Sequence, residues 1–460
     1  MSKGFHFDGL LTNGGWLSPA YVVVEEDGNI SSISTEPDQK SEVNLSFERV
    51  RGFAIPGFQN AHSHAFQYAM AGLAEHLPVG SASDDFWSWR EAMYRLALSI
   101  SPEQMQAIAT MLYAEMARHG YTSVAEFHYL HHGLDGTPYE HLAEMGERLV
   151  LAAQSAGIRI TLIPIFYQMG GFEKQASPQQ RRFLSKDCDT YFALLEASQK
   201  MVQRYQHAHL GVGIHSLRAV QSNDIQRTFA EAHQELPRHI HVAEQQKEVD
   251  ACISVLQRRP VEWLLENVEL DGRYHLVHAT HLIEKEIAGI ASSGAHVVLC
   301  PSTEGNLGDG FFPLREYIQR GGRWSIGTDS HIGLHPAEEL RILDYGQRLL
   351  SQKRNVLCLN AGEDSGHNAY VSSLWGGRKA MGNLSENCFA VGEPLDAVVY
   401  DASHPILAIT PKERRLSAMV YATGPFGMLG TLVDGKWVVS QQKHREYEVI
   451  QKRFTKALDG

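Results

Sequence analysis

Short apolar runs alternate with helix-like segments through the middle of the chain. Eight such runs lie between residues 52 and 329: GFAIPGF, TSVAEF, IRITLIPIF, LGVGIH, HIHVAE, YHLVHA, HVVLC and WSIGTD. The segments between them show apolar positions at helical spacing, as in residues 102–119, which follow the N-cap signal Ser101-Pro102 and end before Gly120. Because strands that alternate with helices form parallel sheets, eight such units predict an α/β protein built on a (β/α)₈ barrel.

The two ends of the chain show a different pattern. Residues 20–33 contain two extended runs around Asp27-Gly28, which is a hairpin signal. The C-terminal region contains the short β-rich runs LDAVVYD, AMVYA and TLVDGKWVV, with turn residues between them. We therefore predict a small β-sandwich domain built from residues 1–54 and 385–460, beside a barrel domain of residues 55–384.

Composition limits the partners and the compartment that we expect. The 460 residues carry a net charge of −12 without a basic stripe, so nucleic acid is not an expected partner. No run of eighteen apolar residues predicts a membrane span, and the N-terminal residues lack the charged start and apolar run of a signal peptide. The five cysteines form no CxxC pair, which argues against a disulfide framework and a cysteine zinc site. A cytoplasmic location is the expectation.

Histidines and carboxylates follow the predicted strands at the positions where barrels carry their active sites. His62 and His64 follow the first run, and residues two apart in extended backbone point to the same side. His241 ends the fifth run, with Glu244 three residues later, and Asp329 ends the eighth. Each of these residues alone is more often structural, but together they supply nitrogen and oxygen ligands of the kind that zinc accepts.

This arrangement resembles the amidohydrolase superfamily over nearly the whole chain, including the β segments at both ends. The resemblance implies that His62, His64, His241 and Asp329 bind one metal ion per subunit, zinc or alternatively Fe²⁺ or Mn²⁺. Residues 201–246 contain no lysine, and so lack the carboxylated lysine of binuclear members. Together with CPSTEGNLGDG after the seventh run, this absence favours the mononuclear deaminase branch.

The resemblance also implies catalytic roles. Glu244 would carry a proton to the leaving nitrogen, while Asp329 and His278 would help to remove the proton of the attacking water. The sixth run offers His275, His278 and His281, of which at most one or two can reach the site. In the family, three residues separate the histidine of this strand from a following leucine. This spacing favours His278 over His281.

Narrower motifs are similar to the deiminases that convert N-formimidoyl-L-glutamate into N-formyl-L-glutamate and ammonia in histidine breakdown. They are HSHAFQ, DDFWSWREAMYR, EFHYLHH and HSLRAV. This similarity implies a small dicarboxylate substrate and a homodimer. It places the substrate against Gln67, Arg90 (with Arg95 as the alternative), Tyr129, His215 and Arg218. The tryptophan-rich motif is also what an amphipathic helix with aromatic residues in the core would show.

Two alternatives remain open from the sequence. Another deaminase of the same branch, acting on guanine or another purine, a pterin or a triazine, would share every metal residue and differ only in the pocket. A non-catalytic barrel would belong to a different class, but such relatives usually lack some of the metal ligands. The complete ligand set in this chain favours an enzyme.

Overall fold

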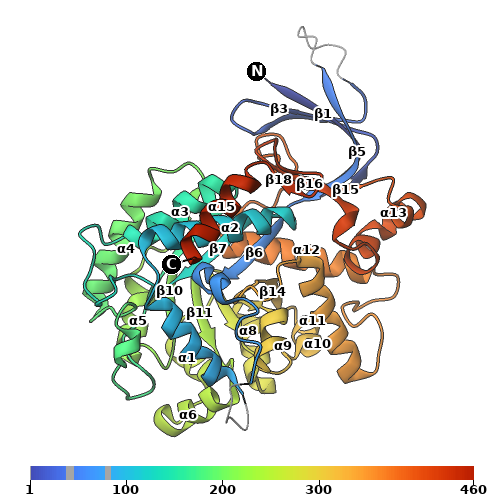
Figure 1. Cartoon of the computed structure of the whole chain (residues 1–460). Coiled ribbons are helices and arrows are strands. Elements are labelled where there is room, and N and C mark those ends of the chain that lie inside the picture. The colour runs from blue at the N-terminus through green and yellow to red at the C-terminus, as the bar shows by residue number, and fades with distance from the viewer. Residues whose placement is uncertain (1, 38–45, 78–83, 460) are drawn as a thin grey trace.

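A computed structural model describes residues 2–37, 46–77 and 84–459 and places the strands in two sheets (Figure 1). The first sheet is parallel, in the order β14-β13-β12-β11-β10-β8-β7-β6, with the short strand β9 (Ala208–Leu210) paired to β8. Its members are β6 (Phe58–Ser63), β7 (Tyr121–His128), β8 (Arg159–Phe166), β10 (Val212–Ser216), β11 (Arg238–Val242), β12 (Tyr274–His278), β13 (His296–Leu299) and β14 (Arg323–Ile326). A parallel bridge between Ser63 and Asp329 nearly closes the sheet, so the predicted eight-stranded barrel is confirmed.

Helices follow the barrel strands and surround them. They are α2 (Pro102–Arg118), α3 (Glu144–Ala156), α4 (Cys188–Val202), α5 (Ser222–Glu231), α6 (Gln246–Leu256), α7 (Pro260–Asn267), α8 (Glu284–Ser293), α9 (Pro301–Leu307), α10 (Leu314–Gln319), α11 (Pro336–Ser351) and α12 (Ser365–Ala380). Helix α2 begins as its sequence predicts, because the Ser101 hydroxyl accepts the Gln104 N–H and Pro102 occupies the first turn. Most buried apolar side chains of these helices and strands form one large cluster, and a smaller separate cluster contains Ala61, Val277, Val298, Cys300 and Ala380.

The second sheet joins the two ends of the chain. It is largely antiparallel, in the order β18-β17-β16-β15-β5-β1-β3-β4, with β2 paired to β1. Its strands are β1 (Lys3–Thr12), β2 (Gly15–Leu17), β3 (Ala20–Val24), β4 (Ile30–Ser34), β5 (Phe47–Pro56), β15 (Ala397–Asp401), β16 (Met428–Val433), β17 (Lys436–Ser440) and β18 (Lys443–His444). Figure 1 shows the N-terminal strands in blue beside the C-terminal strands in red. The β structure predicted from both termini is therefore confirmed, but its strands are hydrogen-bonded into one sheet rather than the two sheets of the expected sandwich.

The last helices lie around the C-terminal strands. They are α13 (Pro405–Ile409), α14 (Arg415–Ser417) and α15 (Tyr447–Leu458), and α15 packs against α2. Residues 418–422, AMVYA, were expected to be extended but are helical. A short apolar run has too few residues for its periodicity to distinguish a buried helical turn from a strand. Among the described residues, no helix combines the length and the apolar character that crossing a membrane requires.

The first apolar run, residues 52–58, divides between the two sheets. Strand β5 ends at Pro56 in the terminal sheet, and β6 begins the barrel at Phe58. Any side chain at the intervening Gly57 would collide with Thr122 of β7, so glycine allows the chain to pass tightly from one sheet to the other. The division of the chain at residues 54 and 384 stays a prediction, and β5 extends past the first of these positions.

Arg159 links the barrel to the terminal sheet. Its Nε lies 2.6 Å from Oδ2 of Asp396, and its Nη2 also pairs with Asp434. The arginine side chain is 20% exposed, so both pairs are partly shielded from water. Partial burial strengthens an ion pair and also raises the cost of leaving one partner alone.

We expect the substitution Arg159→Met to destabilise the metal-loaded protein by about 2 kcal/mol, because two partly buried carboxylates lose their shared cation. Scanning calorimetry would show this as a lower unfolding midpoint. The control is Arg227→Met, since Arg227 pairs with Asp189 and Glu231 at the surface, where ion pairs contribute little. Equal midpoints for the two variants would contradict a structural role for Arg159.

Candidate metal centre and active site

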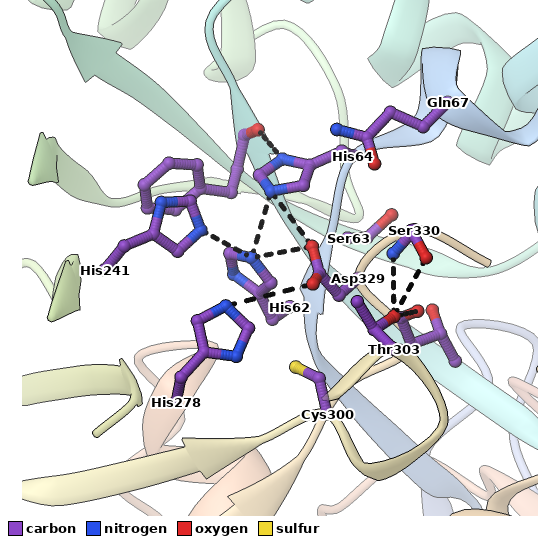
Figure 2. Close-up of polar contacts among 12 residues, drawn as sticks. His62, Ser63, His64, Gln67, His241, His278, Cys300, Thr303, Asp329 and Ser330 are labelled. Carbon is purple, nitrogen blue, oxygen red and sulfur yellow. Dashed lines mark hydrogen bonds and ion pairs between the residues drawn. The ribbon is translucent and has the colours of Figure 1, made fainter. Parts of the chain in front are cut away.

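Three imidazoles and one carboxylate meet at the carboxyl ends of β6, β11 and β14 (Figure 2). Nε2 of His62 lies 3.1 Å from Nε2 of His64 and 3.0 Å from Nε2 of His241. Oδ1 of Asp329 lies 3.4 Å from the His62 nitrogen and 3.1 Å from the His64 nitrogen. The sequence-predicted ligand set is thus brought together in one place.

These distances are those expected between atoms that bind the same metal ion. Metal bonds of about 2.0–2.1 Å to nitrogen and oxygen give ligand-to-ligand distances of about 3.3 Å. Burial, with a smaller contribution from His64, lowers the pKa of His62 to about 3, which favours the neutral imidazole that binds a metal. Neutral imidazoles with facing lone pairs repel each other, and a cation between them removes that repulsion. The arrangement could therefore hold a zinc ion.

Groups behind the ligands fix their orientation. The Nδ1–H of His64 donates to the carbonyl oxygen of Phe127 at 2.8 Å, which leaves Nε2 free to bind a metal. The backbone N–H of Asp329 donates to the His62 carbonyl at 3.0 Å, and the N–H of His64 donates to the Asp329 carbonyl at 3.2 Å. The first and last strands of the barrel thereby hold the ligand-bearing segments against each other.

Two residues of the site adopt left-handed backbone conformations. The φ angle is 67° at His278 and 47° at Asp329, values that residues with a Cβ rarely adopt. Such conformations persist only where surrounding contacts hold them, and they cluster at functional sites. Both angles turn the chain as it leaves a barrel strand, so that each side chain faces the centre.

His278 lies among three carboxylates. Its Nε2 is 3.6 Å from Glu244 Oε1 and 3.8 Å from Asp329 Oδ2, and its Nδ1 is 3.2 Å from Glu304 Oε1. Burial opposes the charged imidazolium, but Glu244, Glu304 and Asp329 outweigh burial and raise the pKa of His278 to about 10. Burial raises the pKa of Glu244 above its usual value, which favours a carboxyl group that can carry a proton at neutral pH.

A narrow cavity opens beside these groups. It is lined by Glu244, His278 and Asp329 and by every residue that the sequence assigned to the substrate, namely Gln67, Arg90, Tyr129, His215 and Arg218. Aromatic side chains complete its wall: Phe86, Trp89, Tyr94, Tyr167 and Phe183. A larger cavity of about 650 Å³ lies at the amino-terminal ends of β13 and β14, but none of the predicted site residues lines it.

The residues between which the sequence left the choice open differ in their position relative to the cavity. Helix α1 (Phe86–Ala97) turns Arg90 toward the cavity, where its guanidinium lies 4.4 Å from the ring centre of Trp87. Arg95, on the same helix, is exposed and does not line the cavity. His278 lines it, whereas His281 does not.

Sequence reasoning missed several buried carboxylates beside the cavity, including Glu304 and Glu248. Glu304 lies in α9, within the motif CPSTEGNLGDG, and contacts His278. Glu248 lies in the first turn of α6 and contacts Arg218, with 3.4 Å between Oε2 and Nη1. Spacing gave no signal for either residue, because an acidic residue in the first helical turn is common for helix stability alone.

Comparisons with known proteins agree with this geometry. Residues 53–438 match the amidohydrolase family. A formimidoylglutamate deiminase from Pseudomonas aeruginosa is 44% identical over 445 residues, which cover 96% of each chain. A more distant relative, the 8-oxoguanine deaminase of the same organism, is 26% identical over 321 residues and 68% of each chain.

Solved structures share the fold. The crystal structure of an amidohydrolase from Brucella melitensis superposes with a TM-score of 0.92 at 39% identity and covers 99% of both chains. An adenosine deaminase from Xanthomonas campestris, solved with bound zinc, gives a TM-score of 0.79 at 21% identity, with 99% of this chain and 97% of that chain covered. The latter likeness shows the fold alone.

We expect the substitution His241→Ala to lower the zinc content of the purified protein well below about one ion per chain, because one of the four proposed ligands is lost. Elemental analysis after gel filtration measures this content. His239→Ala is the matched control, since His239 lies two residues earlier on β11 and its Nε2 donates to the Ala380 carbonyl at 3.0 Å. Retention of the wild-type metal content by His241→Ala would contradict the assignment.

Proposed function

The chain belongs to the amidohydrolase family, and we propose that it hydrolyses N-formimidoyl-L-glutamate to N-formyl-L-glutamate and ammonia. The observation that carries this proposal is the presence of two arginines, Arg90 and Arg218, in the cavity that also contains the acid–base groups. The similarity to a deiminase of that name over nearly the whole chain supports it. With it we propose a cytoplasmic homodimer, as the family resemblance implies.

The proposal includes one metal ion held by His62, His64, His241 and Asp329. Zinc, when bound, supplies a water molecule whose pKa is lowered to about 7 and therefore hydroxide near neutral pH. Fe²⁺ and Mn²⁺ accept the same ligand types and remain alternatives. We propose zinc because three imidazoles and one carboxylate are donors that zinc commonly takes.

The protein groups would manage the protons and charges of the reaction. The water oxygen bonds to the formimino carbon, and the C=N bond becomes a single bond. Asp329 accepts a proton from the water, and Glu244 delivers protons to the nitrogen. The hydroxyl group of the intermediate then loses its proton, the C–N bond breaks, ammonia leaves, and the carbon retains the oxygen as a formyl group. This proton and the one held by Asp329 replace the two that Glu244 delivers. His278, whose raised pKa favours the cation, suits stabilisation of negative charge better than proton acceptance.

The substrate-binding side of the cavity suits a short dicarboxylate. Arginine binds carboxylates through two parallel hydrogen bonds, so Arg90 and Arg218 provide one clamp for each carboxylate. The Gln67 amide donates to the Tyr129 hydroxyl at 2.8 Å, which orients both polar groups at the wall. The aromatic side chains would enclose the aliphatic part of the substrate and exclude water.

The aromatic wall also supports a second candidate. Trp89, Tyr94, Tyr167 and Phe183 could stack on a flat ring, as a deaminase of a purine, pterin or triazine would require. Two arginines in one small cavity favour the dicarboxylate, because a neutral ring offers them no anionic partner.

The first experiment measures ammonia release by the zinc-loaded protein from N-formimidoyl-L-glutamate, N-formimidoyl-L-aspartate, guanine and cytosine. We expect kcat/KM for the glutamate compound to exceed that of the others by about a hundredfold or more, because only it spans both arginine clamps. Efficient turnover of a ring substrate, with none of the glutamate compound, would favour the second candidate.

A variant tests the carboxylate clamp directly. Arg218→Ala should raise KM by about thirtyfold to a hundredfold, because a charge-assisted, bidentate pair with the substrate is lost. Arg95→Ala is the control, since that arginine is exposed outside the cavity and should leave the kinetics unchanged. Wild-type KM in the Arg218→Ala variant would remove this residue from the proposed site.

A further inference from the structure

We propose that Glu248 is a positioning residue that couples the substrate-binding Arg218 to the acid–base residue Glu244, an inference that rests on the proposed function. Glu248 lies in the first turn of α6, which follows β11 and the Glu244 loop. Its side chain is 0% exposed. The same carboxylate oxygen, Oε2, accepts the backbone N–H of Glu244 at 3.1 Å and lies 3.4 Å from Nη1 of Arg218.

Burial makes this contact significant. A carboxylate without water is costly unless a cation or several donors stabilise it. Arg218 is itself only 8% exposed, and its pKa is raised although burial acts against it, because Glu248 and then Glu244 stabilise the cation. Among the residues that the structure describes, Glu248 is the carboxylate that forms an ion pair with Arg218.

The ion pair with Glu248 does not use the full hydrogen-bonding capacity of Arg218. Nη1 of Arg218 is buried and forms no hydrogen bond with the described residues. A buried guanidinium nitrogen without a partner is unfavourable in the protein alone. A substrate carboxylate in the cavity, which Arg218 lines, would supply the guanidinium with further hydrogen-bond partners, while the charge of Glu248 holds the guanidinium in place.

Helix capping is the simpler explanation for Glu248, and the chain contains a matched example of it. Glu286 occupies the same position in the first turn of α8, and its side chain is also 0% exposed. Its Oε2 accepts the N–H of Ile283 at 2.9 Å and lies 2.8 Å from Nε of Arg259. Neither Arg259 nor Ile283 lines the cavity. Glu248 differs because its two partners belong to the active site.

The two contacts of Glu248 can be separated by substitution. Glu248→Gln keeps an amide oxygen that can accept the Glu244 N–H but removes the charge that holds Arg218. Glu248→Ala removes both contacts. If Glu248 acts through Arg218, KM should therefore rise in both variants. If Glu248 also positions Glu244, kcat should fall mainly in Glu248→Ala.

The experiment is steady-state kinetics with N-formimidoyl-L-glutamate in a double-mutant cycle. We expect Glu248→Gln to raise KM by about tenfold with kcat within about threefold of wild type, and Glu248→Ala also to lower kcat by about fivefold or more. In the Arg218→Ala background, Glu248→Ala should raise KM further by less than about threefold, because the group through which it acts is gone. Glu286→Ala should lower the unfolding midpoint but leave KM and kcat within about twofold of wild type.

Two results would overturn the inference. One is wild-type KM and kcat in both Glu248 variants with a lowered unfolding midpoint, which is the behaviour of a helix cap. The other is an equal rise in KM with and without Arg218. If Glu248→Ala does not fold, the KM of the isosteric Glu248→Gln variant tests the inference. Wild-type protein that fails to hydrolyse the compound would overturn the proposed function itself, whereas normal wild-type turnover without coupling would overturn this inference alone.

Discussion

The site depends on how the first barrel strand meets the last. The carbonyl of His62 accepts the N–H of Asp329, and the Asp329 carbonyl accepts the N–H of His64. These backbone contacts lie beside the bridge between Ser63 and Asp329, where the parallel sheet comes nearest to closing. They place the carboxylate of Asp329, which follows the last barrel strand, beside the imidazoles of His62 and His64 at the end of the first strand. A barrel left open at this point would separate the ligands.

The protonation and pairing of the other groups in the site depend on the burial of charged side chains inside the barrel. Burial lowers the pKa of the His62 imidazole there, while the carboxylates around His278 raise the pKa of that imidazole. The same low-dielectric environment strengthens the contact between Arg218 and Glu248. Each buried charge therefore restricts the position of its neighbours, and the cavity has a fixed arrangement of acidic, basic and cationic groups before any ligand enters.

The terminal sheet contributes to the scaffold rather than to the cavity. None of its strands lines the cavity beside His278. Gly57 allows the chain to pass directly from β5 into β6, so the terminal sheet sets where the first barrel strand begins. Arg159 ties the start of β8 to Asp396 and Asp434 of the C-terminal region. These links join the termini to the amino-terminal side of the barrel, opposite the site.

The sequence by itself determined the barrel and the metal-ligand set. Alternation between strands and helices has a local period, and His62 and His64 face the same way because of backbone geometry alone. Only the tertiary structure decided that Arg90 rather than Arg95 faces the cavity, and that Glu304 and Glu248 stand behind His278 and Arg218. Those outcomes depend on how each helix is rotated against the barrel and on contacts between residues far apart in the chain. No local sequence pattern predicts either of these.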